Sequence, residues 1–210
     1  MCHMSENNTT ENNTIENNTT GNNSAENAVV NDIRYKHTKV TSSFMFMLLL
    51  IVADQISKHY IASKLEYGGR VNFIDGFFSI HYVRNTGSAF SFLADKDWGI
   101  YVLTGVSAVF GIALVGLVVF AMLHEHNKIG LCLAMIASGA IGNLCDRFAF
   151  QYVIDFIRFD FGSYTFPIFN FADCYAVIGT ILLIVYIIFS SKDFDSFWND
   201  LFHRKAKDKA

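Results

Sequence analysis

The sequence has little charge and almost no proline. Charged residues make up 17% of its 210 positions and there is a single proline, whereas hydrophobic residues make up 52%. A soluble domain usually has about a quarter charged residues, so the composition argues against an ordinary soluble enzyme. The net charge of −3 offers no basic surface, and we expect no nucleic-acid partner. The four cysteines lack metal-ligand spacing, and three of them lie in or beside apolar runs, so we expect no disulfide framework. We also expect no metal and no cofactor.

The first 40 residues differ in composition from the rest of the chain. Residues 6–25 repeat a five-residue unit (ENNTT, ENNTI, ENNTT, GNNSA) and contain almost no large apolar side chain. Such a segment cannot bury enough apolar surface to offset the entropy lost on ordering. We therefore expect a disordered Asn-rich leader and basic flank over residues 1–40, a membrane domain over residues 41–191, and a basic tail over residues 192–210.

Four apolar segments follow the leader. Residues 44–53 are uncharged, with a helical pattern that continues to about residue 65, and further uncharged runs cover residues 98–123, 129–145 and 174–191. The second run is long enough to cross a hydrocarbon core of about 30 Å. One such run alone could be a buried helix of a soluble protein, but four argue against that alternative. The sequence predicts an all-α membrane protein with four transmembrane helices.

Lysine and arginine predict the orientation of these helices. Residues 32–43, 124–128 and 192–210 carry nine basic residues in 36 positions, whereas residues 63–97 and 146–173 carry six in 63 positions. Cytoplasmic loops are enriched in Lys and Arg. We therefore expect a multi-pass membrane protein with both termini in the cytoplasm.

The first outward loop predicts a small β-rich extracytoplasmic element after the first helix. The segments VNFI and FFSIHYV flank the pair Asp75-Gly76, which favours a tight hairpin turn. An amphipathic hairpin beside the membrane can lie on its surface and help to wall a site.

Three acids lie within or at the ends of the predicted spans: Asp54, Asp146 and Asp173. Charges in a membrane are expensive, so each is a functional hypothesis. The third helix runs outward and ends at Asp146, whereas the fourth begins outside at Asp173. These two carboxylates are therefore expected at the same outer membrane face.

The residues around the two acids fit a shared site. Gly139, Asn143 and Asp146 are spaced i, i+4, i+7 on one helix face, and small residues over 137–142 allow a close helix neighbour. Asn170 and Asp173 have the spacing of a capping box. Each feature also has a purely structural alternative, since Asn170 can simply cap the helix and the small residues can simply pack.

When two carboxylates share a proton, one can act as base toward water and the other as acid toward a carbonyl oxygen. No serine, cysteine or metal motif in the chain competes with this arrangement. The N-terminal end of a helix favours negative charge, which predicts that Asp173 is more often the ionised member than Asp146.

Four ordered blocks resemble the bacterial lipoprotein signal peptidases, or signal peptidase II. The blocks are DQISK (54–58), NTGSAFS (85–91), SGAIGNLCDR (138–147), and VIDF (153–156) followed by FPIFNFAD (166–173). The similarity extends over roughly residues 40–190. It implies a membrane aspartyl endopeptidase of the bacterial cytoplasmic (inner) membrane that cleaves signal peptides from diacylglyceryl-modified prolipoproteins just before the lipidated cysteine.

The resemblance also implies site residues. It places the catalytic pair on Asp146 and Asp173. The substrate-binding or supporting positions that it implies are Asp54, Lys58, Asn85, Gly87, Ala89, Phe90, Asn143, Arg147, Asp155, Asn170 and Ala172. The expected partners are a lipid-modified prolipoprotein and membrane lipids, and the expected state is a monomer.

Two other functions stay open on the sequence. A small ion-coupled transporter could use Asp54, Asp146 and Asp173 as cation or proton sites, but it would be expected to have internal repeats and acids near the bilayer midplane. A catalytically silent membrane scaffold is the second alternative.

Overall fold

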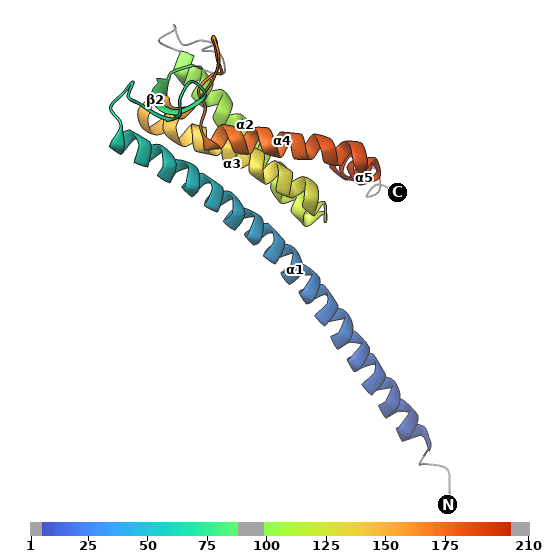
Figure 1. Cartoon of the computed structure of the whole chain (residues 1–210). Coiled ribbons are helices and arrows are strands. Elements are labelled where there is room, and N and C mark those ends of the chain that lie inside the picture. Colours follow the sequence, from blue (N-terminus) through green and yellow to red (C-terminus); the bar gives the residue numbers. More distant parts are fainter. Residues whose placement is uncertain (1–5, 88–98, 203–210) are drawn as a thin grey trace, which may run out of the picture. The chain divides into compact units, whose positions relative to one another are not determined.

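The computed structural model describes the backbone of residues 6–87 and 99–202, and side chains from residue 26 onward within these ranges. The helices are α1 (Glu6–Lys64), α2 (Gly99–Leu123), α3 (Asn127–Phe150), α4 (Phe171–Phe189) and α5 (Ser191–Phe202) (Figure 1). The strands are β1 (Arg70–Ile74), β2 (Phe78–Asn85), β3 (Val153–Phe161) and β4 (Tyr164–Thr165). By their contacts, the residues form two compact units, Met1–Lys39 and Val40–Ala210.

Helix α1 runs from Glu6 to Lys64, so its bounds include residues 6–40 of the segment expected as an Asn-rich leader and basic flank. Once a helix exists, each added residue gains a hydrogen bond without the cost of nucleation.

Within the described residues, four helices are long and apolar enough to cross a membrane, as the sequence predicted. They are Glu26–Lys64, α2, α3 and α4. Many of their apolar side chains face outward, such as Val109 at 71% exposed, Ile112 at 74% and Phe189 at 84%. Exposure on this scale fits a lipid surround and would be unfavourable in water. Helices α1 and α3 end where α2 and α4 begin, and we call this the sheet end of the bundle because the strands connect there.

Helix α3 packs against both α2 and α4 (Figure 1). Its small residues allow this, as expected: a Cβ on Gly139 would collide with the carbonyl oxygen of Ala172 on α4. On α4, a Cβ on Gly179 would lie 2.9 Å from Met135 of α3. Close backbone approach of this kind is how membrane helices gain packing energy without a hydrophobic drive between them.

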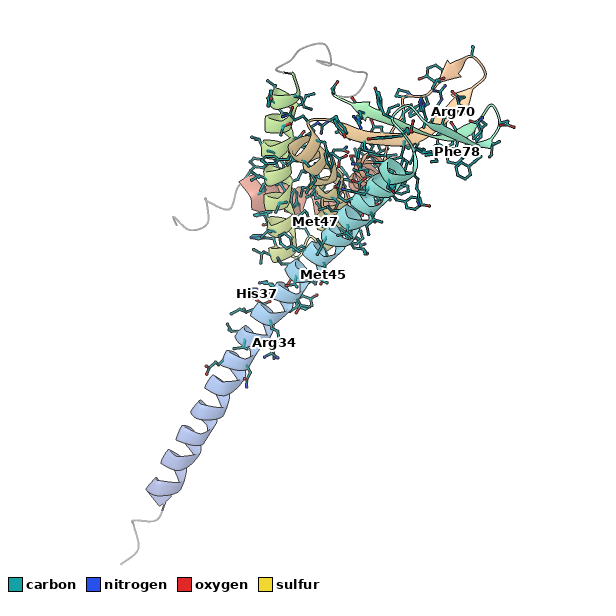
Figure 2. All side chains as sticks on the ribbon, turned by 90° about the vertical axis from the view of Figure 1, so that its left-hand side faces the viewer. Arg34, His37, Met45, Met47, Arg70 and Phe78 are labelled. Carbon is teal, nitrogen blue, oxygen red and sulfur yellow. The ribbon has the colours of Figure 1, made fainter. Side chains whose placement is uncertain are left out.

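The strands form one antiparallel sheet in the order β1-β2-β3-β4. The predicted hairpin is present, with Gly76 at a φ of +71° in the turn between β1 and β2, and Arg70 and Phe78 mark its two strands in Figure 2. Strand β3 was not predicted. It pairs with β2 from Phe78↔Phe159 to Asn85↔Val153, a pairing between distant parts of the chain that no local pattern indicates.

Helix α5 was also not predicted, because residues 192–210 were interpreted only as a basic tail. Its Phe197 is 6% exposed and packs in a core cluster with Met47 of α1, Val118 of α2 and Leu133 of α3. Figure 2 shows Met47 where α1 meets the other helices. The Nε2 atom of His126, in the α2–α3 turn, lies 3.0 Å from the Asp200 carboxylate. The helix therefore closes the end of the bundle opposite the sheet end.

We predict that Phe197→Ala lowers the stability of the protein by about 3 kcal/mol, because it leaves a cavity in this cluster. Phe202→Ala is the matched control, since Phe202 lies on the same helix and is 57% exposed. Thermal unfolding in detergent micelles measures both. Equal melting temperatures for the two variants would contradict the packing role of α5.

Candidate active site

The site at the sheet end begins with a buried lysine on α1. Lys58 is fully buried, and its Nζ lies 2.8 Å from Oδ2 of Asp54 and 3.1 Å from Oδ2 of Asp146. The same ammonium donates to Oδ1 of Asn143 at 2.9 Å. An ammonium has three N–H donors, and each finds an acceptor. Asp54 and Lys58 are spaced i, i+4 on α1, and α3 supplies the other two acceptors.

Asp146 is fully buried and surrounded by donors. Besides Lys58, it accepts hydrogen bonds from Nε2 of Gln55 at 2.9 Å and from the backbone N–H of Ile154 at 3.0 Å. Gln55 also donates to Oδ2 of Asp54 at 3.2 Å and to the carbonyl of Gly142. These contacts tie α1, α3 and β3 together through one carboxylate. Sequence reasoning missed Gln55, although it lies within the DQISK block.

Asp155 on β3 is 3% exposed, and its direct partners are neutral. Its Oδ1 accepts from Nδ2 of Asn170 at 2.6 Å, and its Oδ2 accepts from Nδ2 of Asn85 at 3.0 Å. Burial raises the pKa of the Asp155 carboxyl to about 7, and the charge of Asp173 acts in the same direction. The two amide hydrogen bonds and the charge of Lys58 oppose that rise.

Asp173 lies in the first turn of α4 and is half-buried. The predicted capping box is present: the Asp173 N–H donates to Oδ1 of Asn170 at 3.0 Å, and the Asn170 N–H donates to Oδ2 of Asp173 at 3.1 Å. Nδ2 of Asn143 donates to Oδ1 of Asp173 at 2.8 Å. The positive end of the helix dipole faces this carboxylate.

Asn170 connects the two acids. It is fully buried, its side chain holds Asp155, and its backbone N–H holds Asp173. The side-chain amide also donates to Oδ1 of Asn143 at 3.1 Å. Because Oδ1 of Asn143 accepts from both Lys58 and Asn170, its amide group must point toward Asp173. The network therefore fixes which donors meet the two acids.

The remaining predicted residues fall around this network. The Ala172 N–H donates to Oδ1 of Asp54 at 2.9 Å, and the buried Gly87 N–H donates to Oδ1 of Asn85 at 3.0 Å. Arg147 is half-buried, and its Nε has no hydrogen-bond partner among the described residues. Ala89 and Phe90 lie outside the described residues.

One hydrogen-bonded cluster thus contains most of the predicted site. Its members come from α1, β2, α3, β3 and α4: Asp54, Lys58, Asn85, Asn143, Asp146, Asp155, Asn170, Ala172 and Asp173. Within residues 6–87 and 99–202, no group of three or more His, Cys, Asp or Glu side chains is arranged to hold a metal ion. In this cluster, amides hold the carboxylates of Asp155 and Asp173. The ammonium of Lys58 holds the second pair, Asp54 and Asp146.

The family model described as signal peptidase (SPase) II matches residues 46–189. The chain belongs to the signal peptidase II family. This signal peptidase is therefore a hydrolase of the aspartic peptidase type and a bacterial integral membrane protein, as the four blocks and the apolar helices led us to expect. Membership in the family favours the peptidase over the transporter and the scaffold.

Curated relatives and solved structures agree with this family. The chain is 36% identical over 151 residues to a lipoprotein signal peptidase of Bacillus pumilus (strain SAFR-032), covering 71% of this chain and 94% of the relative. It is 40% identical over 146 residues to a lipoprotein signal peptidase of Streptococcus pyogenes serotype M5 (strain Manfredo), covering 68% and 90%.

Among solved structures, a bacterial membrane enzyme determined by the in meso method at 2.3 Å resolution superposes with a TM-score of 0.62 and 28% identity, covering 72% of this chain and 90% of that one. A second bacterial membrane enzyme, at 1.9 Å resolution, superposes with a TM-score of 0.59 and 29% identity, covering 70% and 92%.

We predict that Lys58→Met destabilises the signal peptidase by about 3 kcal/mol or more, because two buried carboxylates lose their shared cation. The control is Lys64→Met, at the exposed end of the same helix. Thermal unfolding in detergent is the measurement. A melting temperature unchanged by Lys58→Met would show that the buried ion pairs are not needed for the fold.

Proposed function

We propose that this signal peptidase cleaves signal peptides from diacylglyceryl-modified prolipoproteins just before the lipidated cysteine, with Asp155 and Asp173 as its catalytic pair. The names of the relatives support the substrate class. The single observation that carries the choice of residues is Asn170, which holds both carboxylates at once.

This pair differs from the one expected on the sequence in one member. The oxygens of Asp146 accept from a buried ammonium, a side-chain amide and a backbone N–H. All of these donors belong to the protein itself, and the fully buried carboxylate has no exposed surface to offer a substrate. Asp155 meets only neutral amides, and burial raises its pKa to about 7. We therefore assign Asp146 a structural role and transfer the reactive role to Asp155.

In the proposed reaction Asp155 begins protonated and Asp173 ionised. Asp173 takes a proton from water as the water oxygen attacks the scissile carbonyl carbon, and Asp155 gives its proton to the carbonyl oxygen. The tetrahedral intermediate then collapses: Asp173 passes its proton to the departing amine of the cysteine, and Asp155 recovers its own. The two acids titrate as a pair, so these are roles within one shared-proton system.

Three asparagines support this division of roles. Asn85 and Asn170 hold Asp155, while Asn143 and the Asn170 N–H hold Asp173. Neutral donors fix both carboxylates without neutralising either one. The half-buried position of Asp173 leaves it the more accessible of the two to water and substrate.

The proposal includes an orientation. The distribution of Lys and Arg supports cytoplasmic termini, which would place the sheet end and its acids at the extracytoplasmic face. The lipid anchor of the substrate would lie in that leaflet. We further propose that the protein works as a monomer in contact with membrane lipids, since all the acids and amides of the site belong to one chain.

We predict that Asp155→Asn and Asp173→Asn each lower the cleavage rate by a factor of about 10² to 10⁴, because an amide cannot exchange the proton. Purified protein with a diacylglyceryl-modified prolipoprotein provides the assay. Asp146→Asn is the comparison: it should lower the melting temperature while the folded fraction still cleaves. A folded, inactive Asp146→Asn beside an active Asp155→Asn would restore the pair Asp146 and Asp173. If all three variants still cleaved at the wild-type rate, the aspartyl mechanism would be refuted.

The pH dependence follows from the raised pKa of Asp155. A raised pKa means that the protonated form, the proposed acid, dominates below about pH 7. We expect kcat/KM to fall as pH rises through that value, since the free enzyme loses its acid. The pH–rate profile measures this limb, with Asp75→Asn in the exposed hairpin turn as the control. A flat profile to well above pH 7 would exclude Asp155 as the acid.

A further inference from the structure

The sheet carries three arginines among the described residues, and only one of them has no carboxylate as an ion-pair partner there. Nη2 of Arg70 on β1 and Nη2 of Arg158 on β3 both pair with Asp160, at 2.9 and 2.8 Å. Arg84 on β2 is exposed and has no ion-pair partner within the part of the chain that the structure describes. Its charge is therefore available to a ligand.

Three tyrosine rings surround the Arg84 guanidinium. Its Cζ lies 5.1 Å from the ring centre of Tyr67, 5.8 Å from that of Tyr82 and 5.0 Å from that of Tyr152. Its Nε donates to the Tyr82 hydroxyl at 3.1 Å. Rings at these distances attract the cation and fix its orientation, whereas neither Nη group has a partner among the described residues. We call Arg84 and these three rings the arginine cage.

The arginine cage contains residues that lie just past the ends of two candidate membrane spans. Tyr67 follows Lys64, the last residue of α1, by three positions, and Tyr152 follows Phe150, the last residue of α3, by two. Both helices are candidate membrane spans. Tyrosine is enriched where spans leave the hydrocarbon core, so a guanidinium held here meets phosphates.

An apolar surface adjoins the arginine cage on its membrane side. Phe150, in the last turn of α3, stacks on Tyr152 with ring centres 5.7 Å apart. Phe150 itself is 38% exposed. A molecule with a phosphate at the cage can therefore place an acyl chain against the end of α3, which a free phosphate ion cannot do.

We propose that the arginine cage binds the phosphate of an anionic phospholipid. A guanidinium presents two N–H groups in the geometry of a phosphate and forms charge-assisted hydrogen bonds with it. The tyrosine rings hold the guanidinium in place before binding. This site is separate from the proposed catalytic pair, because Arg84 contacts none of its residues in the described structure.

Native mass spectrometry of the full-length protein in detergent tests the site, with phosphatidylglycerol as the probe. We expect Arg84→Gln to weaken phosphatidylglycerol binding about tenfold, since hydrogen bonds to a charged group are lost. Arg84→Lys should give an intermediate loss, because it keeps the charge but not the planar fork. Arg70→Gln is the matched control and should bind as the wild type does, since Arg70 already pairs with Asp160.

Two further ligands test whether the site binds a phospholipid or a free phosphate ion. Diacylglycerol with the same chains should bind at least tenfold more weakly than phosphatidylglycerol, and inorganic phosphate should not compete with the lipid. Equal binding of phosphatidylglycerol by wild type and Arg84→Gln would overturn the proposal, as would equal binding of diacylglycerol or full competition by phosphate. Because the readout is lipid binding, a failure of the proposed peptidase chemistry would leave this result unaffected.

Discussion

The burial of one ammonium group determines the arrangement of the whole sheet end. A cation fully removed from solvent and lipid must be paired, because its unpaired burial costs several kcal/mol. Lys58 meets this requirement with Asp54, Asp146 and Asn143. The second oxygen of Asp54 takes the N–H of Ala172 at the start of α4. A single buried charge therefore fixes α1, α3 and α4 in one relative arrangement.

That arrangement also explains the small residues. A Cβ on Gly142 would lie 2.8 Å from Oδ2 of Asp54, and one on Gly139 would meet the backbone of α4. The glycines of α3 let the charged pair and the helix start come within hydrogen-bond distance. Close packing and charge satisfaction are thus one requirement at this end of the bundle, and neither is met without the other.

The four acids divide by their partners. Asp54 and Asp146 contact the buried Lys58 ammonium, which holds both carboxylates in place and makes them anchors. Asp155 and Asp173 accept hydrogen bonds from amides, which orient each carboxylate without pairing it with a cation. All four residues are aspartates, so only their surroundings distinguish the two structural carboxylates from the two proposed catalytic ones.

Much of this protein could be predicted from local patterns. Apolar runs indicated the four spans, Asp75-Gly76 the hairpin, and the spacing of Asn170 and Asp173 the capping box. The amphipathic pattern of α5 was also present in the sequence, with Phe194 and Phe197 three residues apart, but the charge count of the tail concealed it.

Strand β3 could not be predicted in this way. Two membrane helices, α2 and α3, separate β2 from β3 in the sequence. The pairing of these two strands brings Asn85 to Asp155. The sequence argument therefore chose between acids at helix ends and settled on Asp146. Residues on strands were not considered for the pair, because nothing local indicated that a strand reached the site.

The register of β2 connects the proposed active site to the arginine cage. Successive side chains of a strand point to opposite faces, so Asn85 faces Asp155 while Arg84 faces the tyrosines. The register shifts between Ile80↔Ile157 and Val83↔Asp155, three steps on β2 against two on β3. Such a bulge re-aims the residues beyond it. Without the extra residue, Arg84 would point into the site and Asn85 away from it. One irregular pair in the sheet therefore decides that the cation faces the headgroups and the neutral amide faces the acid.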